Sequence, residues 1–157
     1  RTGLAIGDRQ TGVVAPLGVA EVPLAINDGK SLVEHLAREV EKTLSPKDTI
    51  VFGLPLNMDG TEGPRTKIVR AFAARLEGRT KLKVVFQDER LTSSAADWQM
   101  ARSGMTHQQK KERRDALAAA TILTDYFAAL ARAEGARAEA ERAGGGAGSD
   151  GGAAGGG

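Results

Sequence analysis

Apolar residues recur along the chain in two spacings, which predict strands and helices in alternation. Short apolar runs at 3–7 and 11–22 are separated by the polar stretch DRQ, and this pattern predicts a hairpin of two antiparallel strands. The continuous apolar run 49–55 predicts a strand buried on both faces, and the run 82–87 predicts a fourth strand.

Helical spacing appears in four other segments. The segment 29–44 and the segment 67–78 are amphipathic, and Gly78 is a plausible C-cap of the second one. Thr92 or Ser93 could begin a helix that runs to Met100, and the longest helix is expected over Thr106–Leu130. The segment 57–66 lies between the predicted strand 49–55 and the predicted helix 67–78, and it consists of residues that favour turns. This order predicts a layered α/β domain with a mixed sheet.

The end of the chain differs in composition from the rest. From Ala133 the sequence is rich in alanine, glutamate and arginine, and from Gly144 it is mostly glycine. Glycine loses much backbone entropy on ordering and has no side chain to bury. We therefore expect one domain over 1–131 and a disordered tail over 132–157.

Composition narrows the classes of function. The 157 residues include no cysteine, which excludes disulfides and thiolate metal sites. No apolar run reaches the roughly 18 residues that a membrane span needs, so we expect a cytoplasmic protein with no membrane partner. The net charge of +2 is a weak indication of an anionic partner.

Three carboxylates lie at positions where a functional site could form. Asp88 and Glu89 follow directly after a predicted buried strand, where α/β sheets usually hold ligands. Asp115 lies on the margin of the apolar helical stripe that continues through Ala119 and Ile122. Two acidic groups from separate elements would suit a hard divalent cation, which takes oxygen ligands and keeps several waters.

An ordinary structural explanation of the same residues is also open. Asp88 could accept hydrogen bonds at a strand end, and Glu89 could form an exposed ion pair with Arg90. Asp115 could pair with Arg114 or with an arginine across the helix interface. On spacing alone this explanation is favoured. No histidine site competes with the carboxylates, because His35 and His107 are expected on solvated surfaces.

Basic residues precede Asp115 in the last helix. They could form a phosphate-binding face beside the acids, or simply a solvated first helical turn, although cations at a helix N-terminus oppose the helix dipole. The candidate residues are Lys110, Lys111, Arg113 and Arg114, together with Arg90 and Arg102.

Three ordered motifs make the chain recognisable. The stretch VFGLPLNMDGTEGPRTKIVRAFAARL is followed by VVFQDERLTSSAA and then by RRDALAAATILTDYF. Together they resemble the YqgF family of bacterial Holliday junction resolvase-like proteins, which is associated with 5′-end processing of pre-16S rRNA. The resemblance runs from about Gly3 to Phe127. It implies an RNase H-like fold, with a mixed central sheet flanked by helices, and a nuclease that depends on Mg²⁺ or Mn²⁺.

The resemblance also implies roles for particular residues. One active-site acid of the family lies in the DER segment, which maps to Glu89 with Asp88 beside it, and another maps to Asp115. Asn57 and Asp59 match the GLPLNMDG signature and are expected to face the substrate or shape the site, although a tight turn would need the same residue types. The implied partners are pre-16S rRNA, a ribosome precursor and branched DNA.

The chain departs from the family pattern at its start. Family members open with a strand that ends in D-x-G-x-[KR], whose aspartate is a metal ligand, and this chain begins at the residue that matches the end of that pattern, Arg1. Asp8 follows the next strand and is not a substitute. We therefore expect a fragment that lacks the first strand and has a gap in its core. A catalytically incompetent rRNA- or DNA-binding module and a Holliday junction resolvase remain the alternatives.

Overall fold

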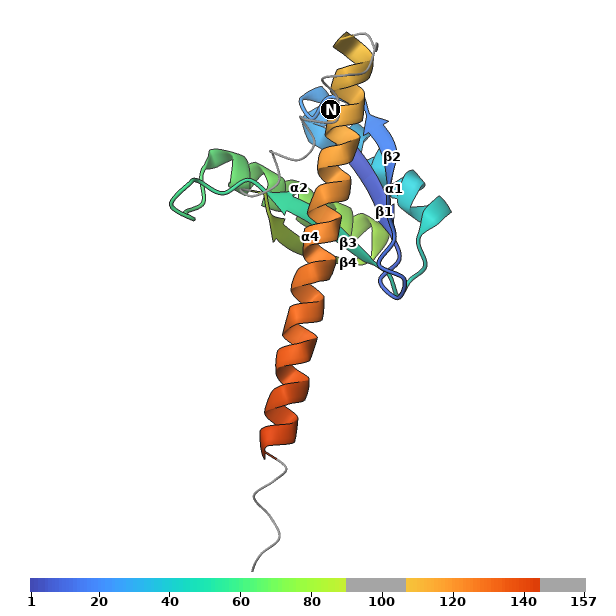
Figure 1. The fold of residues 1–157 in the computed structure, drawn as a ribbon. Helices are drawn as coiled ribbons and strands as arrows, with labels where there is room; N and C mark the ends of the chain where they lie inside the picture. Colours follow the sequence, from blue (N-terminus) through green and yellow to red (C-terminus); the bar gives the residue numbers. More distant parts are fainter. Residues whose placement is uncertain (90–106, 145–157) are drawn as a thin grey trace, which may run out of the picture.

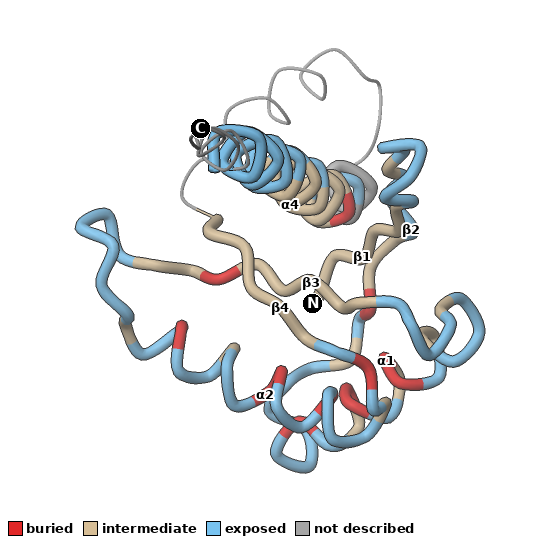
Figure 2. The backbone as a smooth tube through the Cα atoms, turned by 90° about the horizontal axis from the view of Figure 1, so that it is seen from below, coloured by how far each residue is buried: buried red, intermediate tan, exposed pale blue. Residues whose placement is uncertain are grey.

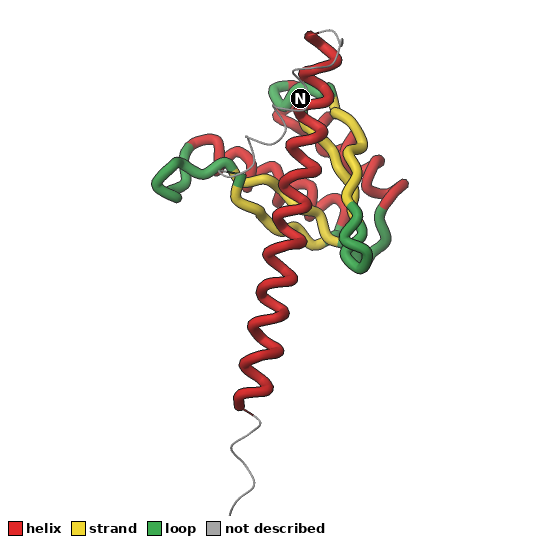
Figure 3. Tube along the Cα trace, viewed as in Figure 1, coloured by secondary structure: helices red, strands yellow, loops and turns green. Residues whose placement is uncertain are grey.

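Strands and helices alternate in the computed structural model of the protein, which describes residues 1–89 and 107–144. Figure 3 shows the strands, helices and loops of this part of the chain. In chain order the elements are β1 (Thr2–Gly7), β2 (Val14–Ala20), the 3-10 turn η1 (Ile26–Gly29), α1 (Lys30–Thr43), β3 (Thr49–Leu54), α2 (Pro64–Thr80), β4 (Lys83–Asp88) and α4 (His107–Gly144).

The elements form three layers. The strands lie between α4 on one face and the helices α1 and α2 on the other (Figures 1 and 2). The main core lies on the side of α1 and α2, because both helices turn their apolar stripes toward each other and toward the strands. Its buried residues are Ala20, Leu32, Val33, Leu36, Ala37, Phe72 and Leu76.

The first two strands form the predicted hairpin. β1 and β2 pair antiparallel, with a register shift between Leu4 and Ala5. Asp8 closes the turn, because its carboxylate accepts hydrogen bonds from the backbone N–H groups of Gln10 at 2.7 Å and Thr11 at 2.9 Å. These hydrogen bonds lower the pKa of Asp8. Asp8 therefore has a local structural role.

The four described strands include antiparallel and parallel pairs, as a mixed sheet requires, but they are divided into two parts. β1 pairs only with β2, and β3 pairs in parallel only with β4, so the described part of the chain contains two two-stranded sheets. A cavity of about 1520 Å³ lies between them and is bordered by β1, β3, α1 and α4. The expected gap in the core is thus present, and it keeps β1 and β3 out of hydrogen-bonding reach.

Two helix boundaries differ from the prediction. α2 begins at Pro64, where proline suits the first turn, and it continues past Gly78 to Thr80. Its C-cap is Lys81, at a φ of 60°. The glycine is an interior helical residue.

The last helix is longer than expected. α4 extends beyond Leu130 to Gly144, so the segment 132–144, which was expected to be disordered, is helical. Alanine, glutamate and arginine are strong helix formers, which explains this extension. The domain boundary at residue 131 stays a prediction. The predicted helix that ends at Met100 and the tail 145–157 lie outside the described residues.

The length and composition of α4 bear on the expectation that no segment of the chain could span a membrane. The segment Arg113–Gly144 is long and apolar enough to cross a membrane by length and composition, an exception to the expectation that no stretch qualifies. Helices that pack on a protein core pass the same test. The first part of α4 packs on β1 and β2, which accounts for its apolar side chains.

β1 and α4 approach each other closely at Gly3, and this contact provides a test of the packing. A Cβ atom added at Gly3 would overlap the backbone carbonyl of Asp115. We expect Gly3→Ala to destabilise the protein by about 1–3 kcal/mol, because the helix must shift. Gly78→Ala is the matched control, since nothing lies within 4 Å of its added Cβ, and it should stabilise the protein by roughly 0.5–1 kcal/mol. Equal urea midpoints for both variants would contradict this packing.

Candidate metal centre

Glu89 lies just beyond the carboxyl end of β4. Its backbone N–H donates a hydrogen bond to the carbonyl of Leu54, at the end of the neighbouring strand β3, over 3.2 Å. The side chain turns back over β3 at Gly53, where an added Cβ would meet the Glu89 carboxylate. Gly53 therefore makes room for this carboxylate. A glycine within a strand often marks such a close approach, so Gly53 is the sequence feature from which this position of Glu89 could have been predicted.

Burial changes the acidity of Glu89. Desolvation raises its pKa, and the neighbouring Asp88 carboxylate raises it further. Asp88 is the last residue of β4 and is paired with Leu54 in the parallel register. The two acids thus lie at the carboxyl edge of the β3–β4 pair, as the pattern predicted.

Asp115 lies in α4, whose side chains the structure describes from Arg113 onward. The next residue, Ala116, is buried, and the carbonyl of Asp115 lies against Gly3 of β1. Arg1 forms an ion pair with Asp115, with 3.5 Å between its Nε and the Asp115 Oδ2. An arginine across the helix interface was one of the open alternatives, and Arg1 takes that role.

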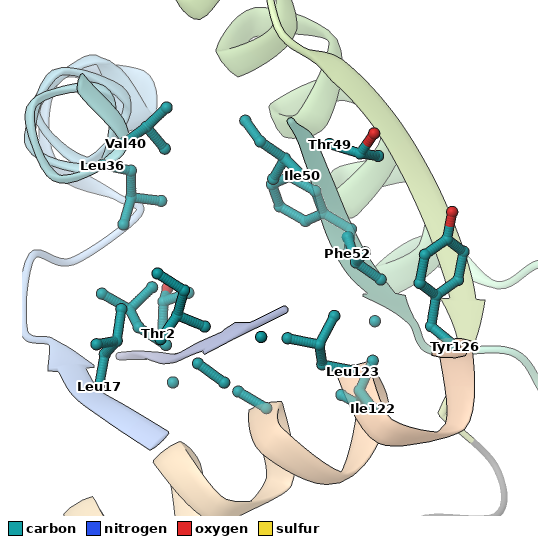
Figure 4. Close-up of a pocket in the computed structure, with 18 of the residues that line it drawn as sticks. Thr2, Leu17, Leu36, Val40, Thr49, Ile50, Phe52, Ile122, Leu123 and Tyr126 are labelled. Carbon is teal, nitrogen blue, oxygen red and sulfur yellow. The ribbon is translucent and has the colours of Figure 1, made fainter. Parts of the chain in front are cut away.

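Glu89 and Asp115 lie on the wall of the same cavity. Both residues line the space between the two strand pairs. Figure 4 shows the apolar side chains around that space, with Leu36 and Val40 on one side, Ile50 and Phe52 on another, and Ile122, Leu123 and Tyr126 from α4. The structure therefore brings Glu89, just beyond β4, and Asp115 of α4 to a common cavity with a largely apolar lining. His35 is half-buried on α1 and does not line it.

The structure describes the side chains of only some of the basic candidate residues. Arg113 and Arg114 are exposed on α4. Lys110 and Lys111 belong to the same helix, but their side chains lie outside the described part, as do Arg90 and Arg102 altogether. The basic face beside the acids thus stays a prediction.

Asn57 and Asp59 lie in the loop between β3 and α2, and both side chains hold that loop together. The Asn57 amide donates to the Thr61 hydroxyl at 2.9 Å. The Asp59 carboxylate accepts hydrogen bonds from the backbone N–H of Thr61 at 2.9 Å and from its hydroxyl at 2.6 Å. The tight-turn explanation therefore accounts for both residue types, and direct contact with substrate is not needed to explain them.

The donor set fits a hard divalent cation in part. Carboxylate oxygens are the ligands that Mg²⁺ and Mn²⁺ prefer, and Mg²⁺ is usually bound by one or two carboxylates plus water and substrate phosphate. Glu89 and Asp115 are the candidate pair, because both line the same cavity. No group of three or more acidic, histidine or cysteine side chains is close enough to hold a metal within residues 1–89 and 107–144. Apart from Asp88, which is next to Glu89 in the chain, any further ligand would come from outside this part, from solvent or from the substrate.

The amino-acid sequence matches one protein family and many relatives within it. The family model described as RuvX, Holliday junction resolvase, matches residues 1–129. A relative from Colwellia psychrerythraea is 39% identical over 125 residues, which are 80% of this chain and 80% of the relative. Relatives from Cronobacter sakazakii and Escherichia coli are 41% and 38% identical, and the match covers 80% of this chain and 86% of each relative. All three carry the name "Putative pre-16S rRNA nuclease".

The family has an RNase H-like fold, and the observed alternation of strands and helices agrees with it. The resemblance expected from the three sequence motifs is confirmed by the match over residues 1–129. From this match, and from relatives of about 40% identity over four-fifths of its length, the chain belongs to the RuvX family of Holliday junction resolvase-like proteins.

Proposed function

We propose that this protein is a nuclease that hydrolyses phosphodiester bonds with Mg²⁺ or Mn²⁺ held by Glu89 and Asp115. The observation that supports this most is the shared cavity: Glu89, just beyond β4, and Asp115 of α4 both line it. Asp88 lies beside Glu89 and is proposed as a further ligand or as the base that orients water. A divalent cation at such a site would activate water and stabilise the leaving oxygen.

The protein groups have separate tasks in this proposal. The Leu54 carbonyl and the space at Gly53 fix where the Glu89 carboxylate lies. Arg1 orients Asp115 through their ion pair. Arg113 and Arg114, with Lys110 and Lys111 earlier on α4 and Arg90 beyond β4, would contact the phosphates of the nucleic acid. Such contacts position the substrate without reading its sequence.

The names of the relatives suggest the substrate. They support nuclease action on pre-16S rRNA. We further propose that the cut is made at the 5′ end, with a ribosome precursor as the partner and the cytoplasm as the place of action. The description of the family supports branched DNA as a second substrate, as in a Holliday junction resolvase.

A second candidate function is a binding module without catalysis. Two observations favour it: Arg1 already neutralises Asp115, and the described residues supply no group of three metal-binding side chains. This alternative predicts binding of RNA that weakens as salt rises. Arg114→Ala would then lower affinity about equally for different sequences and would reduce the salt slope by about one.

Cleavage assays separate the two functions. The protein expressed from its complete gene is incubated with an end-labelled pre-16S rRNA fragment and with a four-way DNA junction, in Mg²⁺, in Mn²⁺ or in EDTA. We expect cleavage of the RNA with either metal and none in EDTA. Salt-dependent binding without cleavage under any metal would instead support the binding module.

A further inference from the structure

Beyond the carboxylates, the loop between β3 and α2 has an unusual tip. Met58 is 89% exposed there, more than any other large apolar side chain in the described part of the chain. A turn that only connects two elements has no need of a long apolar side chain at its tip. Methionine is flexible and polarizable, and it is favoured on surfaces that adapt to a partner.

The tip is held in one shape. The backbone N–H of Asn57 donates to the Thr61 carbonyl at 2.9 Å, and the N–H of Gly60 donates to the Asn57 carbonyl at 2.8 Å. Gly60 has a φ of 85°, which a residue with a side chain rarely adopts. With the side-chain bonds of Asn57 and Asp59 to Thr61, these contacts hold the backbone that carries Met58, so little ordering is required when a partner binds.

The base of the loop is anchored as well. Thr66 is fully buried and donates a hydrogen bond to the Pro55 carbonyl. Arg70 donates to the Glu62 carboxylate from Nε at 2.8 Å and from Nη2 at 2.5 Å, and its guanidinium lies 4.7 Å from the centre of the Phe86 ring. The loop is thereby fixed to both α2 and β4, and it projects away from the body of the molecule (Figure 1).

The position and charge of this loop indicate the kind of partner. The loop leaves β3 directly after Leu54, which binds the backbone of Glu89, so it starts at the edge where the carboxylates lie. Two exposed cations follow in the first turn of α2, Arg65 and Lys67, and neither has an acidic partner within the described residues. An apolar tip beside unneutralised cations suits a nucleic acid, whose phosphates attract cations and whose base steps accept apolar side chains.

We propose that Met58 is an apolar wedge that contacts nucleic acid at an interrupted base stack, such as a bulge or a branch point. An interrupted step is favoured over a continuous duplex because the unstacking cost is already smaller there. Arg65 and Lys67 bind the flanking phosphates. This inference rests on the proposed action on nucleic acid, and it adds the contact that selects the structure of the substrate.

The test uses RNA duplexes that carry 2-aminopurine next to a bulge, and fully paired duplexes of the same sequence, in EDTA so that no cleavage occurs. We expect the protein to raise the fluorescence of the bulged probe and to bind it more tightly than the paired one. Met58→Ser should lose the fluorescence change and lower affinity for bulged RNA about tenfold, with little effect on paired RNA. Met58→Leu should keep both properties. Val13→Ser, at an apolar residue that is 64% exposed in the hairpin turn, is the matched control.

The outcomes separate this inference from the proposed catalysis. Loss of the fluorescence change in Met58→Ser supports the wedge even if the protein cleaves nothing. An unchanged preference for bulged RNA in Met58→Ser overturns the wedge, even if the protein cleaves RNA with Mg²⁺. Absence of any RNA binding overturns both.

Discussion

Asp115→Asn is expected to lower the rate of metal-dependent cleavage at least about a thousandfold while the protein stays folded. The substitution keeps the size of the side chain but removes the negative charge that a divalent cation requires. Within the described residues, the folded state loses the ion pair with Arg1, in which 3.5 Å separate the two groups and the side chains are 22% and 31% exposed. Such pairs contribute about 0–1 kcal/mol to stability.

The control for this variant lies on the same helix. Asp125 belongs to α4 but does not line the cavity, so Asp125→Asn should leave the cleavage rate unchanged. Rates are measured on the end-labelled RNA, and folding is measured by circular dichroism and urea denaturation. Full activity in Asp115→Asn would remove this residue from the site, and an unfolded variant would show that its role is structural.

Glu89→Gln is expected to abolish cleavage to a similar extent and, in addition, to stabilise the metal-free protein at neutral pH. Burial raises the pKa of Glu89, and the Asp88 carboxylate raises it further, so the folded protein holds the charged form at a cost. Glutamine removes that charge and keeps the shape. Gain of stability with loss of activity is common at functional sites.

The raised pKa fixes the direction of the pH dependence. The folded state retains the Glu89 proton more strongly than the unfolded state does. The protonated Glu89 side chain therefore makes its full contribution to stability below the ordinary glutamate pKa. That contribution is lost as pH rises through the raised pKa of Glu89 in the folded protein. In EDTA, the difference in the free energy of unfolding between Glu89→Gln and the parent should grow in favour of the variant across this range.

Glu39 provides a control of opposite sign. Its pKa is lowered, first by a hydrogen bond from Lys42 and then by the charge of Lys42. The ionised Glu39 side chain therefore contributes to stability above the ordinary glutamate pKa, and this contribution is lost as pH falls through the lowered pKa of the folded protein. Glu39→Gln should therefore not stabilise the protein at neutral pH. A Glu89→Gln variant that is less stable than the parent at neutral pH would show that the carboxylate makes compensating contacts.

Much of the local structure could be predicted because it depends on local signals. The apolar spacing placed β1, β2, β3, β4, α1 and α2 within a few residues, since each element buries one side against the core. The position of Asp115 on the margin of the α4 stripe also followed from helical spacing. The resemblance added the link between this acid and the DER segment, which spacing alone did not provide.

Other features depend on contacts between distant residues, and the sequence did not reveal them. The separation of the strands into two pairs agrees with the gap that the resemblance implied, but no local signal in the sequence indicates it. The ion pair of Arg1 with Asp115 joins the residue before β1 to α4, and neither residue type indicates its partner in the sequence. The residue type of Gly78 favours a helix C-cap, but α2 continues past it because the C-cap geometry forms at Lys81. Met58 was missed because a single apolar residue in a loop carries no periodic signal.

The central claim is that Glu89 and Asp115 together hold a divalent cation, and Mn²⁺ binding tests it most directly. Electron paramagnetic resonance measures free Mn²⁺ during titration into the protein expressed from its complete gene, without nucleic acid. We predict a bound Mn²⁺ that Mg²⁺ displaces, with binding weakened at least about tenfold in both Glu89→Gln and Asp115→Asn. Mn²⁺ binding that is unchanged in both variants would contradict the assignment of the metal to these two carboxylates.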